Sequence, residues 1–228
     1  MKNFFAPADK MFQSVSKAME YAVADWGIAQ MAKKMGKQAD FENFSRRADY
    51  FKNYFDKNIG FIRAKMNDGS WRTPYDPIKA NHTVSDFTEG NGWQYTFFAP
   101  QNPEGLIELF GGDKSFTQKL DQFFVTTGDL GEHASPDISG LIGQYAHGNE
   151  PSHHIAYLYA FAGEQWKTAE KVRFILNDFY TNKPDGIIGN EDCGQMSAWY
   201  ILSSLGLYQV NPMNGLFVFG SPIFEKVT

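Results

Sequence analysis

Three short stretches of the sequence combine carboxylate, amide and imidazole side chains with glycines and lead into aromatic-rich helical patterns. They are residues 88–95 (TEGNGWQY), 145–154 (YAHGNEPSHH) and 189–195 (GNEDCGQ). In each stretch the turn residues precede the apolar run, so the polar groups are expected at helix N-termini above an apolar body. Three such junctions in one chain predict the rim of a single cleft.

Glu89 could act as a general acid. It lies in a glycine-containing turn, four residues before Trp93. An aromatic ring beside a carboxylic acid disfavours the charged form, and a general acid must carry a proton. The alternative is a surface turn residue without a chemical role.

Glu150 directly follows Asn149 and directly precedes Pro151. Because proline is favoured at the first position of a helix, Glu150 could be an N-cap. Alternatively, Asn149 and Glu150 could bind a hard cation, since Ca²⁺ prefers carboxylate and amide oxygens. The sequence leaves both roles open.

Zinc is not expected in the second stretch. The motif His-Glu-x-x-His is absent, and the inverted motif that begins at His147 meets Pro151 where its second histidine should stand. His153 and His154 fall in the first turn of a helix. They are expected to hydrogen-bond a ligand or a neighbouring loop.

Glu191 and Asp192 are adjacent carboxylates at the start of another helical pattern. Negative charge is favoured there, and repulsion between the two predicts that one of them titrates abnormally. Asp192 is therefore either a helix cap or a general base. One acid and one base on separate loops above aromatic helices suit the hydrolysis of a glycosidic bond.

These residues must be positioned by a mainly α chain of paired helices with irregular loops. The periodicity of residues 14–35 and 40–55 predicts an αα-hairpin. Glu20 and Asp25 are expected on a solvated face, and the alternative is that one of them points into a cleft. Residues 61–73 have turn chemistry, and an irregular segment continues to residue 87. Further helices are predicted over residues 93–98, 104–110, 114–125, 151–162, 164–180 and 193–205, and a strand over residues 215–220.

The composition narrows the possible functions. The chain has 228 residues, 43% of them hydrophobic, which is enough for a sizeable core. Its net charge is −5 with no basic block, so nucleic acid is not an expected partner. Cys193 is the single cysteine, no apolar run approaches the ~20 residues of a membrane span, and no signal peptide is visible. Aromatic residues reach 16%, and some could stack on sugar rings.

Together, the three stretches resemble the signature motifs of glycoside hydrolase family 92, whose members are calcium-dependent, inverting exo-α-mannosidases. The resemblance extends over nearly the whole chain. It implies that residues 1–228 are a segment of an (α/α)6-barrel catalytic domain, a partial toroid, with the family's N-terminal β-sandwich and first barrel helices outside it. It also implies mannose-containing glycans as partners and a periplasmic or secreted parent protein.

The resemblance assigns roles to individual residues. Glu89 would be the general acid and Asp192 the base that activates water. Asn149 and Glu150 would help to hold Ca²⁺ against the mannose hydroxyls. The candidate sugar contacts are Trp93, His153, His154, Asn190 and Gln195.

Two alternatives remain beside this hypothesis. A non-catalytic carbohydrate-binding or accessory module could keep the pocket without turnover. An (α/α)-barrel hydrolase or lyase for another sugar could share the architecture and act on a different substrate.

Overall fold

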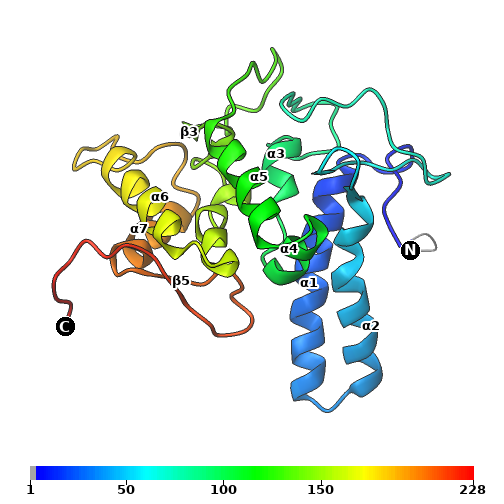
Figure 1. Cartoon of the computed structure of the whole chain (residues 1–228), viewed down its shortest axis with the longest axis horizontal. Coiled ribbons are helices and arrows are strands. Elements are labelled where there is room, and N and C mark those ends of the chain that lie inside the picture. The colour runs from blue at the N-terminus through cyan, green and yellow to red at the C-terminus, as the bar shows by residue number, and fades with distance from the viewer. Residues whose placement is uncertain (1–3) are drawn as a thin grey trace. The chain divides into compact units, whose positions relative to one another are not determined.

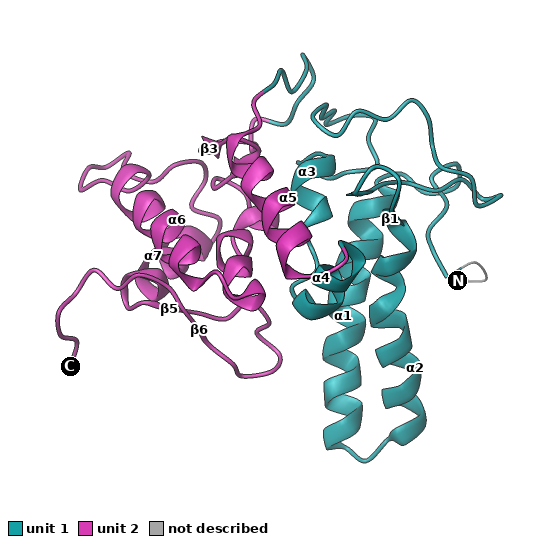
Figure 2. Ribbon diagram, viewed as in Figure 1, with its two compact units in different colours: residues 1–110, 128–135 teal, residues 111–127, 136–228 magenta. Residues whose placement is uncertain are grey.

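The computed structural model describes residues 4–228 and divides the chain into two compact units. Unit 1 comprises Met1–Phe110 and Gly128–Ser135, and unit 2 comprises Gly111–Thr127 and Pro136–Thr228 (Figures 1 and 2). Both units are built mainly from helices with short two-stranded β elements. The prediction of a mainly α chain with irregular loops is therefore confirmed.

Unit 1 begins with the predicted helical hairpin. Helix α1 (Ser14–Lys34) and helix α2 (Gln38–Ala48) lie side by side and run in opposite directions (Figure 1). Gly36 allows the sharp turn between them because its φ is +70°. The predicted second helix extended to residue 55, but the 3₁₀ helix η1 (Asp49–Tyr54) replaces its last part. A 3₁₀ turn has three residues, which places the fully buried Phe51 and Tyr54 on one side.

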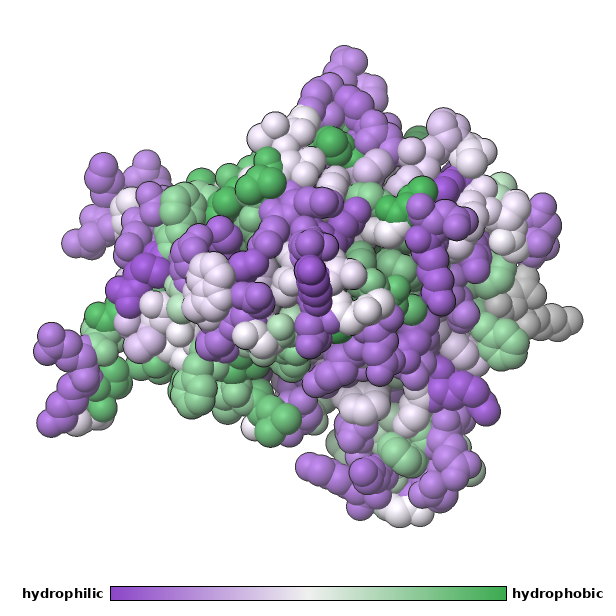
Figure 3. Space-filling model, in the orientation of Figure 1, coloured by the Kyte–Doolittle hydropathy of each residue, from purple (hydrophilic) through white to green (hydrophobic). Residues whose placement is uncertain are grey.

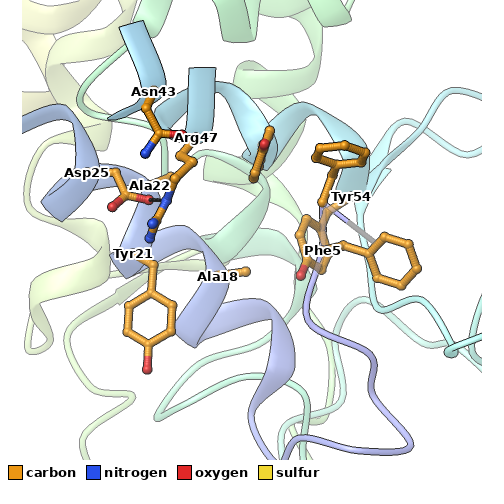
Figure 4. A pocket seen from close by; sticks show the side chains of 10 residues that line it. Phe5, Ala18, Tyr21, Ala22, Asp25, Asn43, Arg47 and Tyr54 are labelled. Carbon is orange, nitrogen blue, oxygen red and sulfur yellow. Dashed lines mark hydrogen bonds and ion pairs between the residues drawn. The ribbon is translucent and has the colours of Figure 1, made fainter. Parts of the chain in front are cut away.

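A partly buried ion pair joins the two helices of this hairpin. The Nε atom of Arg47 in α2 lies 2.9 Å from a carboxylate oxygen of Asp25 in α1, and Figure 4 shows the two side chains pointing toward each other. They line a small hollow of about 200 Å³. Asp25 is buried, so its expected place on a solvated face is wrong, whereas Glu20 is exposed as predicted. The pairing gives Asp25 a structural role.

Short strands and two further helices complete unit 1. Strand β1 (Phe55–Asp56) pairs antiparallel with β2 (Phe61–Ile62), and Lys65 bridges to Trp71 across the predicted turn. Helices α3 (Gly92–Thr96) and α4 (Pro103–Leu109) follow. The segment between β2 and α3 contains no helix or named strand, as the sequence predicted.

Unit 2 contains three α-helices, α5 (Asp113–Val125), α6 (Gln165–Asp178) and α7 (Gln195–Ser204). Strand β3 (Leu141–Ile142) pairs with β4 (Tyr145–Ala146), and β5 (Leu207–Tyr208) pairs with β6 (Val218–Phe219). The strand predicted near the C-terminus is β6, and its partner β5 was not predicted.

The predicted α-helix over residues 151–162 is instead two 3₁₀ helices, η2 (Glu150–Ser152) and η3 (Ile155–Ala162). Residues 155–159 are all fully buried. Because this segment packs against other residues on all sides, it has no single apolar face whose spacing would favour the α-helical pitch over the 3₁₀ pitch. Periodicity could identify a helical segment here but could not distinguish the two geometries.

The surface of the face drawn in Figure 3 is mostly hydrophilic, with hydrophobic patches that include the surroundings of the C-terminal segment. Leu216, Phe217 and Phe219 are exposed apolar side chains near the C-terminus. Among the described residues, no helix combines the length and apolar character that crossing a bilayer requires.

Candidate active site

The loop that leads to Glu89 is fixed on the start of helix α1. The first amide groups of an α-helix have no partner within the helix. Here the amides of Val15 and Ser16 both donate to the carbonyl oxygen of Asp86, at 3.1 and 3.2 Å. The carboxylate of Asp86 accepts hydrogen bonds from the Ser14 hydroxyl at 3.2 Å and from Arg72 at 2.7 Å. The loop therefore caps the helix, and the helix holds the loop.

The residues on both sides of Glu89 are also held. The Thr88 amide donates to the Ser16 hydroxyl at 2.6 Å, and the Tyr95 hydroxyl donates to the Thr88 carbonyl at 2.8 Å. On the other side, Asn91 and Gln94 form a reciprocal capping box at the start of α3. Glu89 is thus a half-buried carboxylate on a turn with fixed ends, which differs from an unrestrained surface turn.

Glu89 and Asp192 share an unusual backbone conformation. Their φ values are +47° and +52°, in the left-handed region that side chains disfavour. Five non-glycine residues have positive φ among residues 4–228, and the two carboxylates predicted as acid and base are among them. Such strain persists only where the surroundings enforce it, and it clusters at functional sites.

The charge of Glu89 lies near a buried hydroxyl group. Burial raises the pKa of Tyr95, a hydrogen bond with Ser16 lowers it, and the negative charges of Glu20 and Glu89 raise it further.

Trp93 is a buried residue that is 6% exposed. Its ring packs edge-on against Phe61, with ring centres 4.8 Å apart. The role of Trp93 as a sugar contact stays a prediction.

In unit 2 the second and third motif stretches meet at two glycines. A Cβ atom at Gly189 would lie 2.9 Å from the Cα of Gly148 and 3.0 Å from the Ser139 hydroxyl. A Cβ atom at Gly148 would lie 2.0 Å from the same hydroxyl. The backbones at these two positions are so close that only glycine, which has no Cβ atom, fits. This close approach brings the loop of Asn149 and Glu150 against the loop of Asn190 and Asp192.

Replacing Gly189 by alanine is expected to destabilise the protein by about 2–4 kcal/mol, because a left-handed φ of +77° and the contact with Gly148 both oppose a side chain. Gly194→Ala is the matched control, since Gly194 has a φ of +96° but open space around it. Urea unfolding should show the larger loss for Gly189→Ala. Equal losses for the two variants would mean that the two loops do not pack as described.

His153 connects the same two loops. Its Nε2 donates to the carbonyl oxygen of His147 at 3.0 Å, and its Nδ1 accepts from the side-chain amide of Gln195 at 3.1 Å. The indole of Trp199 donates to the His153 carbonyl at 3.0 Å. Both ring nitrogens therefore bond to protein groups. His153 and Gln195 thus hydrogen-bond each other, and their direct contact with sugar stays a prediction, as does that of the buried His154.

The folded state should lose stability as the pH falls, because burial lowers the pKa of His153 to about 4. Above pH ~6.5 the imidazole is neutral in the folded and unfolded states. Below that pH the unfolded chain binds a proton that the folded chain does not. Between pH 7 and pH 5, His153 should therefore remove about 2 kcal/mol of stability.

The test is to measure urea unfolding at both pH values for the unchanged protein, His153→Gln and His82→Gln. The His153 variant should show a weaker pH dependence, and the exposed control His82 should not change it. An undiminished dependence in His153→Gln would contradict the assignment.

A buried network around His147 was not predicted. The Nδ1 of His147 lies 2.8 Å from the Tyr145 hydroxyl, and its Nε2 lies 2.7 Å from the Tyr180 hydroxyl. The Tyr180 hydroxyl donates to the carbonyl oxygen of Met196 at 3.4 Å, so it accepts from Nε2, and Tyr145 donates to Nδ1. The sequence signal was the spacing of Tyr145 and His147, two residues apart and hence on one side of an extended chain.

The helix-cap alternative for Asp192 is wrong. Helix α7 has Gly194 at its N-cap, and Glu191 accepts hydrogen bonds from the amides of Gly194 and Ser197. Hydrogen bonds with Ser197, and then with Gly194, lower the pKa of Glu191. Repulsion between the two adjacent carboxylates would have raised the pKa, so the lowered pKa of Glu191 has a different cause from the expected one. Asp192 is exposed and its side chain does not cap the helix, and its role as general base stays a prediction.

The cap alternative for Glu150 is also wrong, because Asn149 occupies the N-cap position of η2 and no side-chain cap bond forms. Asn149 is buried and Glu150 is exposed. Their oxygens have the chemistry that Ca²⁺ prefers. However, residues 4–228 contain no cluster of three or more histidine, cysteine, aspartate or glutamate side chains that could hold a metal.

The side-chain amide of Asn190 donates a hydrogen bond to the carboxylate of Asp137 at 3.1 Å. A contact of Asn190 with sugar stays a prediction.

Comparison with known proteins gives three kinds of match. The glycosyl hydrolase family 92 catalytic domain matches residues 1–228. The chain is 41% identical to a family GH92 α-mannosidase from Bacteroides thetaiotaomicron, solved in complex with mannoimidazole. The TM-score is 0.92, over 97% of this chain and 30% of that chain. A family GH92 inverting mannosidase from the same organism is 34% identical, with a TM-score of 0.83, over 98% and 31% of the two chains.

A curated relative, an uncharacterized secreted glycosidase from Arthroderma benhamiae, is 25% identical over 95% of this chain and 28% of its own. The chain thus spans about a third or less of the length of these relatives. The likeness to the solved structures agrees with the predicted fold class, a mainly α, partial (α/α)6 toroid of paired helices.

Proposed function

Since this chain belongs to the glycosyl hydrolase family 92 catalytic domain, we propose that the protein is an inverting exo-α-mannosidase that releases mannose from glycans. In this proposal the chain is a segment of an (α/α)6-barrel catalytic domain. Two solved relatives support it: one is named an α-mannosidase and binds mannoimidazole, and the other is named an inverting mannosidase. The curated relative is named a secreted glycosidase, which supports a secreted location for the parent protein.

Glu89 and Asp192 are the proposed acid and base. Glu89 protonates the oxygen of the departing sugar, and Asp192 removes a proton from the water that attacks the anomeric carbon from the opposite side. An inverting mechanism requires about 6.5–9.5 Å between the two carboxyl groups, which leaves room for the water. Because its neighbour Glu191 takes the role at the start of α7, Asp192 is available to accept that proton.

Asn149 and Glu150 are the proposed protein ligands of Ca²⁺. When bound, such a cation would supply positive charge that orients the mannose hydroxyls. Two side chains make up only part of the six to eight oxygen ligands that Ca²⁺ takes, so carbonyl oxygens, water and the sugar would supply the others. The close approach of Gly148 and Gly189 supports this assignment, because the loop of Asn149 and Glu150 there contacts the loop of Asp192.

The observation that carries the proposal is the left-handed backbone at both carboxylates, within a chain that matches the glycosyl hydrolase family 92 catalytic domain. The test is to incubate the protein with α-mannosides and follow the anomer of the released mannose by NMR. β-Mannose should form first. Binding of mannosides without release would favour a binding module, and release of other sugars alone would favour a different hydrolase or lyase.

Chelation by EDTA should abolish mannose release, and added Ca²⁺ should restore it. Glu150→Ala should raise the Ca²⁺ concentration for half-maximal activity by at least about 10–100-fold, because it removes a charged oxygen ligand. Glu170→Ala, which removes an exposed carboxylate from α6, should leave that concentration unchanged. Titration of activity with Ca²⁺ measures both. An unchanged requirement in Glu150→Ala would exclude Glu150 from the metal site.

A further inference from the structure

The hollow in the α1–α2 hairpin serves none of the roles assigned above. It lies within unit 1, has a volume of about 200 Å³, and has the Asp25–Arg47 ion pair in its wall (Figure 4). In other proteins an apolar cavity of about 150 Å³ can hold one benzene molecule. The hairpin hollow is therefore large enough for one six-membered ring.

The sequence of α1 creates this space. Ala18, Ala22 and Asp25 recur at the spacing i, i+4 and i+7, so they share the face of α1 that lines the hollow. The alanine side chains end at the Cβ atom and leave room beside the helix. Five aromatic side chains also belong to the lining: Phe4, Phe5, Tyr21, Tyr50 and Tyr54.

The aromatic part of the lining is attached to the 3₁₀ helix η1. The hydroxyl of Tyr54 accepts a hydrogen bond from the Ala6 amide, and the side-chain amide of Asn53 donates to the Phe4 carbonyl at 3.1 Å. The rings of Phe4 and Tyr50 pack edge-on with centres 5.3 Å apart. These contacts form the hollow before any ligand binds.

The ion pair leaves hydrogen-bonding atoms over. The Nε atom of Arg47 donates to Oδ2 of Asp25 at 2.9 Å. Within residues 4–228, the Oδ1 atom of Asp25 and the two terminal nitrogens of Arg47 have no hydrogen-bond partner. Asp25 is only 6% exposed. Because a buried carboxylate oxygen without a donor is costly, a ligand that donates to it is favoured.

The two charges of the lining cancel, and this selects the class of ligand. Asp25 would repel an anion, and Arg47 would repel a cation. An apolar ligand would cover polar atoms without pairing them. A neutral sugar meets both needs, because its neighbouring hydroxyl groups can donate to the carboxylate and accept from the guanidinium. Its C–H groups can pack on the aromatic rings.

We propose that the hairpin hollow is a second sugar-binding site, which holds one neutral pyranose unit of a glycan without cleaving it. None of the proposed catalytic or Ca²⁺-binding residues lines it. Tyr21 and Asn43 are exposed members of the lining, and within residues 4–228 the Tyr21 hydroxyl and the Asn43 side-chain nitrogen have no partner. They would bind the hydroxyl groups that remain near solvent. The inference goes beyond the proposed function, since it requires neither Ca²⁺ nor hydrolysis.

The test is to titrate the full protein with methyl α-mannoside in EDTA by isothermal titration calorimetry. EDTA removes the Ca²⁺ on which the proposed catalytic site depends, so binding in its presence reports the hairpin hollow. Tyr21→Ala and Asn43→Ala should each raise the Kd about tenfold, the usual effect of one hydrogen bond. Ala22→Leu fills the hollow and should abolish measurable binding.

Two matched controls should leave the Kd unchanged. Asn58→Ala removes an exposed asparagine of unit 1, and Ala24→Leu enlarges an exposed alanine of α1, and neither residue lines the hollow. Circular dichroism should show unchanged helix content in Ala22→Leu. If that variant unfolds, Tyr21→Ala and Asn43→Ala decide the test, because both residues are exposed.

Three results would overturn the site: no binding of methyl α-mannoside in EDTA, an unchanged Kd in Tyr21→Ala and Asn43→Ala, or an equal rise in the controls. Tighter binding of mannose 6-phosphate than of methyl α-mannoside would overturn the neutral ligand. The proposed function fails separately, when the protein binds the mannoside in EDTA as described but releases no mannose from α-mannosides in Ca²⁺.

Discussion

Replacing Glu89 by glutamine in the full protein should reduce kcat/KM for an α-mannobiose by about 10²–10⁴-fold, the usual contribution of general acid catalysis. Glutamine keeps the shape of the side chain but has no carboxylic proton to transfer. The same variant should hydrolyse α-mannosyl fluoride at nearly the original rate, since fluoride departs without protonation by the enzyme. Steady-state kinetics on both substrates measures the contrast.

Glu20→Gln provides the control for this experiment. Its carboxylate also acts on the Tyr95 hydroxyl, but it belongs to helix α1 and is exposed. It should leave both substrates unaffected. A similar loss in Glu20→Gln would indicate that activity depends on the negative charge near Tyr95 and not on proton transfer by Glu89. Full activity of Glu89→Gln on the disaccharide would remove Glu89 from the mechanism.

Asp192→Asn should reduce hydrolysis of both substrates by about 10²–10⁴-fold, because water must be activated whichever group leaves. Asparagine tolerates a left-handed backbone better than most residues, so the φ of +52° can be kept. Asp185→Asn, in an exposed turn of unit 2, is the control and should be neutral. A variant that still hydrolyses the fluoride would not fit a general base.

The sequence was sufficient to predict most helices. Helix α1 was predicted over residues 14–35 and spans Ser14–Lys34, because its apolar residues recur with the helical period and Gly36 ends it. Periodicity failed for residues 49–54 and 155–162. Both form 3₁₀ helices, whose pitch depends on the packing of buried residues that are distant in sequence.

The site was predicted less completely. Motif spacing identified the carboxylates but could not decide which neighbour caps a helix, and Glu191 does so instead of Asp192. The cap depends on the backbone at Gly194, which the sequence does not display. The bonds of His147 to two tyrosines were missed because Tyr180 lies 33 residues away. Whether Glu89 and Asp192 face one sugar stays a prediction that the paired kinetics above would test.

The hydrogen bonds from the first amides of helix α1 to the Asp86 carbonyl oxygen also have a consequence for the order of folding. A helical hairpin such as α1 and α2 can form early from local contacts, whereas the first turn of α1 obtains its acceptor only after a stretch of about 70 residues has looped back. The strained turn at Glu89 is therefore expected among the last parts of unit 1 to become native. During refolding, the amides of Val15 and Ser16 should gain protection from hydrogen exchange later than the middle of the same helix.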